Sequence, residues 1–211
     1  ALKHDGSTAW EQDLGPFKGG HGFGASPIVY QDLVIIGNDQ DGDSSLLALD
    51  KATGQLRWKT ERTSKRTTYS TPCVFSPPGQ DPLLIFTDWN HGISAINPAT
   101  GALVWEKSVF GESTERAIGS PVAAGDLIIG TCGFVTSTKH VVALKPCIGE
   151  PTEVEQVYHL ERGAPHIPTV VAYQDMLLLW ADNGIVTCCN LADGNTVWQK
   201  RIGGTYMAWA V

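Results

Sequence analysis

Short apolar runs separated by turn-forming residues dominate the hydrophobic pattern of this chain. Four such runs, at positions 33–36, 83–86, 127–129 and 176–180, are each bounded by Gly, Asp or Asn. Apolar runs this short, lying between turn signals, predict buried strands, because a helix is usually about ten residues or longer. We therefore expect one buried strand at each of the four positions.

A residue-proline pair followed by β-forming residues precedes each apolar run. The successive prolines are 45, 49 and 47 residues apart. Proline is tolerated at the first residue of a strand, where its missing N–H is not yet needed for pairing. Each pair therefore predicts the start of a further strand. The four pairs are Ser26-Pro27, Thr71-Pro72, Ser120-Pro121 and Ile167-Pro168.

A hairpin turn that leads to a tryptophan follows the apolar runs. The segments 48–58, 95–105 and 188–198 each place Gly four residues before Trp. The glycine supplies the positive φ that a tight turn needs, and an Asp or Asn side chain earlier in the turn caps its N–H groups. A large flat Trp side chain with one N–H group is suited to pack between neighbouring sheets.

Two further copies of this motif are incomplete. In the copy that begins at Ala143, Glu153 stands where Trp is expected, and Tyr158 is the nearest aromatic residue. A partial copy opens the chain and ends in Trp10. The residues that we expect to dock one sheet on the next are Gly6, Trp10, Ala48, Gly54, Trp58, Ala95, Gly101, Trp105, Gly194 and Trp198.

Four short strands in each period of about 45 residues are the signature of a β-propeller blade. The sequence thus predicts an all-β chain of four-stranded antiparallel blades, and we expect four blades plus a stray strand, an open arc of a larger propeller of roughly 7–8 blades. The expected divisions are 1–25 for the last strand of a preceding blade and its connection, then blades at 26–70, 71–119, 120–166 (degenerate) and 167–211.

The motif residues resemble the PQQ-like (pyrroloquinoline-quinone-like) repeat family, whose tryptophan-docking motif runs Ala-x-Asp-x-x-Thr-Gly-x-x-x-Trp. The segments 21–27, 39–44 and 47–50 look like those of exported bacterial PQQ-like repeat proteins. The resemblance implies an exported, periplasmic or cell-envelope protein. It also implies two functional alternatives, because the family contains both quinoprotein dehydrogenases and non-catalytic scaffolds similar to the outer-membrane assembly lipoprotein.

The net charge, the hydrophobic pattern and the cysteine content limit the kinds of partner, metal site and disulfide that we expect. The 22 acidic and 15 basic residues give a formal charge of −7, so we expect neither nucleic acid nor an anionic membrane surface as a partner. Stretches of 18 apolar residues do not occur, so we expect no membrane insertion. The five cysteines show neither metal-type spacing nor an even count, and they therefore indicate neither a zinc site nor a disulfide framework.

The chemistry of a quinoprotein would require PQQ held with Ca²⁺. Asp39, Asp41 and Asp43 alternate around Gly42, and such a loop could hold Ca²⁺, but the remaining calcium-site signature is weak and we favour a solvated acidic hairpin tip. The resemblance to quinoproteins also suggests a vicinal disulfide between Cys188 and Cys189. Their position within a strand favours two separate packed thiols instead.

Propeller ligands usually meet the loops at one end of the central channel, and the segments before each proline lead there. If the chain has a ligand site, we expect it among residues of these segments. They are His21, Phe23, Arg66, Tyr69, Glu115, Arg116 and His166.

A binding or scaffold propeller, which presents loops to a protein, peptide or glycan in the cell envelope, is the function we favour, with no catalysis and no cofactor. A fragment of a PQQ- and calcium-dependent dehydrogenase is the first alternative. The second is a structural unit completed by self-association, in which a second copy or the parent chain supplies the missing blades.

Overall fold

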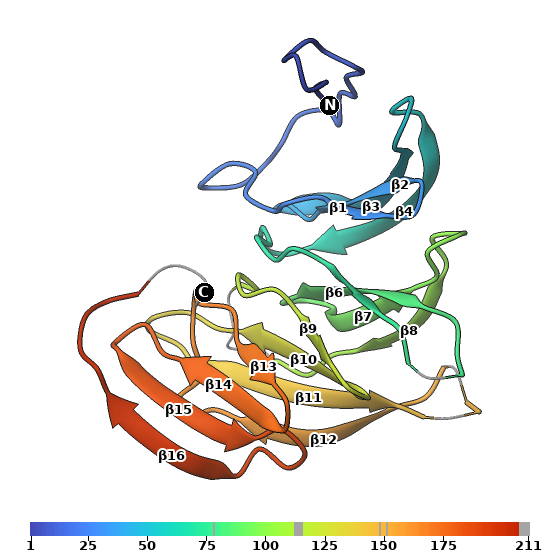
Figure 1. Cartoon of the computed structure of the whole chain (residues 1–211). Coiled ribbons are helices and arrows are strands. Elements are labelled where there is room, and N and C mark those ends of the chain that lie inside the picture. Colours follow the sequence, from blue (N-terminus) through green and yellow to red (C-terminus); the bar gives the residue numbers. More distant parts are fainter. Residues whose placement is uncertain (78, 112–115, 148, 151, 207–211) are drawn as a thin grey trace.

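The computed structural model describes residues 1–77, 79–111, 116–147, 149–150 and 152–206. These residues form sixteen strands in four four-stranded antiparallel sheets, with the strands of each sheet in chain order. Figure 1 shows successive sheets lying beside one another in chain order. The expected all-β architecture of four-stranded blades is confirmed.

Each sheet lies within one period of the repeat and begins one to three residues after its proline. Blade 1 contains β1 (Ile28–Tyr30), β2 (Leu33–Asn38), β3 (Gly42–Asp50) and β4 (Leu56–Ser64). Blade 2 contains β5 (Cys73–Phe75), β6 (Leu83–Asp88), β7 (Gly92–Ile96) and β8 (Leu103–Lys107). Blade 3 contains β9 (Val122–Ala124), β10 (Leu127–Cys132), β11 (His140–Pro146) and β12 (Val154–Leu160). Blade 4 contains β13 (Val171–Tyr173), β14 (Met176–Trp180), β15 (Ile185–Asn190) and β16 (Thr196–Arg201).

The segment 1–25 differs from the stray strand expected for it. Its one pairing is an isolated bridge between Leu2 and Thr8, and the N-terminal ammonium donates to the Trp10 carbonyl at 2.8 Å. A strand needs a neighbouring strand to satisfy its N–H and C=O groups, and the described residues give this segment none.

The hydrophobic core lies between the blades. Ile35 and Leu46 of blade 1 pack with Leu84 and Ile96 of blade 2, and equivalent clusters join blade 2 to blade 3 and blade 3 to blade 4. The second and third strands of blades 2 and 3 therefore lie between two neighbouring blades and are buried on both faces. This burial explains their continuous apolar sequences. Burying each of these large side chains contributes roughly 1.5–3 kcal/mol.

The tryptophan motif docks one blade on the next. The Trp58 indole N–H donates to the Pro98 carbonyl at 2.8 Å, and its ring covers Gly101 so closely that a Cβ there would lie 2.6 Å from the indole. Trp10 repeats this arrangement on the turn that contains Gly54. In the degenerate copy, the Tyr158 ring lies against Gly194, so tyrosine takes the place of tryptophan.

A register shift recurs at the same point of every blade, in the third strand just before the turn. It falls between Ala48 and Leu49 in blade 1, and between Cys188 and Cys189 in blade 4. Both cysteines are buried free thiols. The expected packed thiols, rather than a vicinal disulfide, are what the fold contains.

Main-chain to side-chain hydrogen bonds join the starts of neighbouring blades. The Ser26 N–H donates to Thr71 Oγ1 at 3.3 Å, the Thr71 N–H to Ser120 Oγ at 3.0 Å, and the Ser120 N–H to Thr169 Oγ1 at 3.1 Å. We call this series the hydroxyl latch. In blade 4 the latch residue is Thr169, which follows the proline, whereas in the other blades it precedes the proline.

Candidate functional site

Three of the predicted ligand-binding residues come together where the connections between blades meet. The Arg116 guanidinium lies 5.9 Å from the centre of the Tyr69 ring. The main chain fixes both residues, because the Tyr69 N–H donates to the Ala117 carbonyl at 3.0 Å and the Arg116 carbonyl accepts from Gly133 at 3.1 Å. Tyr69 Oη is buried and has no hydrogen-bond partner among the described residues.

His166 completes this group from the connection before blade 4. It is 7% exposed, and the Phe134 ring packs edge-on against it at 5.1 Å between centroids. The main-chain N–H of His166 donates to Asp182 Oδ2 at 2.9 Å, and Lys139 Nζ lies 3.9 Å from the same oxygen. We refer to Tyr69, Arg116, Lys139, His166 and Asp182 as the inner cluster.

Burial favours the neutral form of the His166 ring. Burial lowers the pKa of His166, the Lys139 and Arg116 cations lower it further, and the Asp182 carboxylate opposes them. Its Nε2 is buried without a partner among the described residues. The inner cluster therefore presents two cations, a carboxylate, an imidazole and a phenol, which suits hydrogen bonding to a polar ligand group.

The other predicted ligand-binding residues lie apart. His21, Phe23 and Arg66 are exposed, and Phe23 contacts Phe17 with ring centroids 5.5 Å apart. Glu115 lies outside the described residues.

The three aspartates considered for Ca²⁺ have separate surroundings. Asp39 is 3% exposed and accepts two hydrogen bonds from the buried Arg62 guanidinium, one of them at 2.6 Å from Nε. Asp41 Oδ1 accepts from the N–H and the hydroxyl of Thr67, at 2.7 and 3.0 Å. Asp43 is exposed. Among the described residues, these carboxylates do not form a group that could share one ion.

A similar buried carboxylate, Asp88, is the last residue of β6 in blade 2. Asp88 accepts hydrogen bonds from the Ser64 and Thr68 hydroxyls at 2.7 and 2.9 Å, and from the main-chain N–H groups of Asn90 and His91 at 2.7 and 3.0 Å. All its strong acceptor positions are in use. Asp88 therefore serves the blade-to-blade connection.

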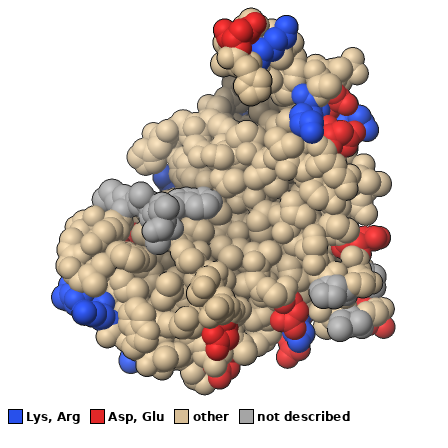
Figure 2. Space-filling model, viewed as in Figure 1, with Lys and Arg blue, Asp and Glu red and all other residues tan. Residues whose placement is uncertain are grey.

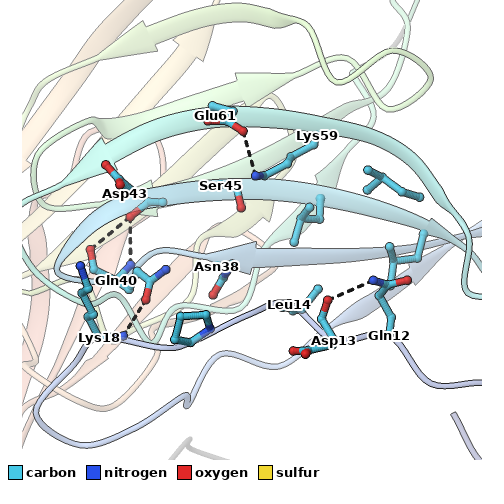
Figure 3. Close-up of a pocket in the computed structure, with 15 residues that line it drawn as sticks. Gln12, Asp13, Leu14, Lys18, Asn38, Gln40, Asp43, Ser45, Lys59 and Glu61 are labelled. Carbon is cyan, nitrogen blue, oxygen red and sulfur yellow. Dashed lines mark hydrogen bonds and ion pairs between the residues drawn. The ribbon is translucent and has the colours of Figure 1, made fainter.

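A groove of about 380 Å³ lies between the segment 12–18 and the outward face of blade 1. Figure 3 shows Gln12, Asp13, Leu14 and Lys18 along one side, with strands β2, β3 and β4 opposite. Leu47, Leu49 and Leu56 supply apolar surface. The polar lining residues include Asn38, Gln40, Asp43, Ser45, Lys59 and Glu61, of which Lys59 and Glu61 form an ion pair at 2.8 Å.

The segment 12–18 is fixed at one end of the groove. The Lys18 N–H donates to Gln40 Oε1 at 2.6 Å, and the Lys18 carbonyl accepts from the Asp41 N–H at 2.8 Å. From the sequence, Asp43 was named only as a candidate calcium ligand, and the other groove residues were not singled out. Alternating apolar side chains along β3, on the face opposite the core, could have indicated them.

Surface charge is unevenly distributed. On the face shown in Figure 2, Lys, Arg, Asp and Glu side chains lie mainly along the outline, and the middle of the face is largely uncharged. Within the described residues, no helix has the length and hydropathy needed to cross a membrane.

Four-stranded antiparallel sheets, stacked face to face and docked through one aromatic residue per repeat, define a β-propeller of repeated blades. The chain belongs to the PQQ_2 family, described as outer membrane protein assembly factor BamB, whose model matches residues 1–200. The resemblance to PQQ-like repeat proteins is thereby confirmed. A comparison with curated proteins gives no significant match.

Solved structures with the same fold include BamB from Moraxella catarrhalis, at a TM-score of 0.64 and 17% identity, with 95% of this chain and 56% of that chain covered. The quinohemoprotein alcohol dehydrogenase ADHIIG from Pseudomonas putida HK5 matches at 0.65 and 12% identity, covering 97% and 48%. The computationally designed Ika8 protein matches at 0.55 and 11%, covering 86% and 50%. The chain thus spans about half the length of these structures, and at these identities the likeness concerns the fold alone.

Proposed function

We propose that this chain is a non-catalytic binding or scaffold propeller of the cell envelope, and that the blade 1 groove binds an extended segment of a protein or peptide partner. The observation that carries the proposal is the way the segment 12–18 already lies over the same sheet face. A face that accepts one extended chain offers the exposed Leu56 side chain for burial and polar groups for hydrogen bonds to another. The inner cluster offers a second polar contact point.

The envelope location rests on the family. The matching model is described as an outer membrane protein assembly factor, and we extend that location to this chain as part of the proposal.

The aspartates support binding over quinoprotein chemistry. Calcium beside PQQ would need carboxylate oxygens that are free to bind it. Asp39 is committed to Arg62, and Asp41 accepts from Thr67. These aspartates therefore do not fit a calcium ion bound beside PQQ.

A blade supplied by the parent chain or by a second copy is the structural alternative, and one observation favours it. Trp198 occupies the docking position of blade 4 but is 45% exposed, whereas Trp58 at the same position of blade 1 is 7% exposed. Sedimentation of the chain at micromolar concentration distinguishes the two sources, because a stable monomer excludes self-association.

Two leucines at the same position of neighbouring blades give a matched test of the groove. Leu56 and Leu103 each follow their turn glycine by two residues, and each is 53% exposed, but only Leu56 lines the groove. Peptides selected from a displayed random library against the wild-type chain are measured individually by fluorescence anisotropy. We expect Leu56→Asp to weaken their binding by about tenfold or more and Leu103→Asp to leave it unchanged, because only the former places a charge on the contact surface.

Equal affinity for the wild type and Leu56→Asp would overturn the groove assignment. Bound PQQ absorbance together with dye-linked alcohol oxidation, after addition of PQQ and Ca²⁺, would instead support the dehydrogenase alternative.

A further inference from the structure

Three side chains with metal-binding atoms meet on blade 3, away from the groove. His140 is the first residue of β11, His159 lies near the end of β12, and Glu161 directly follows that strand. His140 Nδ1 is 2.7 Å from His159 Nε2, and one ligand atom from each of the three residues lies within 4.8 Å of the others. Among the described residues, this is the one group of three that could hold a metal ion.

Strand register explains the meeting. Val142 of β11 pairs with His159 of β12, and Val141 pairs with Leu160, so position 140 stands opposite position 161. Side chains alternate between the two faces of a sheet, which places His140, His159 and Glu161 on the same face. This is the face that Val142 buries against blade 2.

The three residues combine a fixed ligand with two adaptable ones. His140 is 5% exposed, and its ring contacts the Phe110 ring with centroids 6.3 Å apart. Its Nε2 is buried without a hydrogen-bond partner among the described residues. His159 and Glu161 are exposed and accessible from solvent.

We propose that His140, His159 and Glu161 bind a divalent transition-metal ion of the zinc type. Two imidazoles and one carboxylate match the borderline preference of such ions and leave a fourth position for water or a partner's ligand. With Zn–N bonds of about 2.0–2.1 Å, the two nitrogens in a tetrahedral site stand roughly 3.3 Å apart. The two nitrogens, which lie 2.7 Å apart, therefore need to separate by about 0.6 Å to admit the ion.

Such an ion would link the start of β11 to the end of β12 through coordinate bonds. Blade 3 is the blade in which Tyr158 replaces the docking tryptophan. An ion that binds the folded chain and not the unfolded chain raises its stability in proportion to the logarithm of the free metal concentration.

Zinc binding by the full chain tests the proposal. After removal of metals with EDTA and dialysis, zinc chloride is titrated by calorimetry, and Tm is recorded with and without zinc. We expect one zinc per chain and a raised Tm, and a loss of about tenfold or more in affinity for His159→Gln and for Glu161→Gln, because each variant removes one of three ligands. His4→Gln, which changes an exposed histidine outside the cluster, is the matched control and is expected to bind as the wild type does.

Cobalt gives a second measurement that does not depend on stability. Co²⁺ in the wild type should show the visible absorption of a four- or five-coordinate nitrogen and oxygen site, and His159→Gln should lose it. Equal zinc affinity in the wild type and His159→Gln, or no zinc-dependent heat and no Tm shift in the wild type, would overturn the proposal.

Discussion

Single glycines control how closely the blades dock. Gly101 has φ +73°, and a Cβ at this position would meet the Trp58 ring at 2.6 Å and Thr60 Oγ1 at 3.0 Å. A side chain at this position would therefore destabilise the fold in two ways, through strain in the left-handed backbone and through a steric clash with the indole that covers the turn.

Gly101→Ala is expected to lower the free energy of unfolding by about 2–4 kcal/mol, the sum of left-handed strain and overpacking against Trp58. Chemical denaturation followed by tryptophan fluorescence measures the change. Gly125→Ala is the control, because Gly125 has φ +63° but open space around its Cβ position, so we expect strain alone, about 1–2 kcal/mol. Equal losses in the two variants would show that the indole contact contributes nothing.

The role of a single residue was predictable from the sequence where the same residue recurs in each copy of the motif. The Gly-to-Trp spacing of Trp58 predicts its docking, and the fold contains that contact. The partner of Asp39 was not predictable, because Arg62 lies 23 residues away and only the pairing of β3 with β4 brings that stretch of β4 close. In the sequence alone, an aspartate of a solvated acidic loop cannot be told from one in a buried ion pair, because the partner lies on another strand.

At the scale of elements, the hydroxyl latch holds the first strands of neighbouring blades together. Ser120 is 5% exposed, and its Oγ accepts the Thr71 N–H at 3.0 Å. The first strands β5 and β9 are only three residues long and can form few main-chain hydrogen bonds. Side-chain hydrogen bonds therefore add to their attachment.

Ser120→Ala is expected to cost about 1–3 kcal/mol of unfolding free energy, because it leaves the Thr71 N–H without its acceptor. Ser26 occupies the same latch position in blade 1 but is exposed, so Ser26→Ala should change stability by less than about 0.5 kcal/mol. Urea denaturation of both variants checks the difference. A neutral Ser120→Ala would mean that solvent replaces the serine hydroxyl.

The elements themselves were predictable because apolar runs, prolines and turn glycines mark each strand independently. The register between paired strands was harder to predict from the sequence. His140 and His159 are 19 residues apart, a spacing without meaning for metal binding, and only the pairing of β11 with β12 brings their rings to 2.7 Å. In blade 4 Thr169 takes the latch role that the residue before the proline has in the other blades, because Ile167 at that position has no hydroxyl group.

At the scale of the whole molecule, stability should vary from blade to blade. Each blade contacts only its neighbours, so protection from solvent depends on how many of its faces are covered. Strands β6 and β10 are buried along their whole length, while every residue of β16 is exposed.

Hydrogen exchange followed by mass spectrometry is expected to reveal this gradient. The slowest amides should lie in β6, β7, β10 and β11, because they open only when two interblade cores separate. The outer strands β8 and β16 give the matched comparison, since both are last strands of their blades, but Trp105 in β8 is 4% exposed and Trp198 in β16 is 45% exposed. We expect β16 to exchange faster than β8 by about tenfold or more. Equal exchange in the two strands would mean that the docking tryptophan adds no local stability, or that a second copy covers β16 in solution, and sedimentation at the same concentration separates these two explanations.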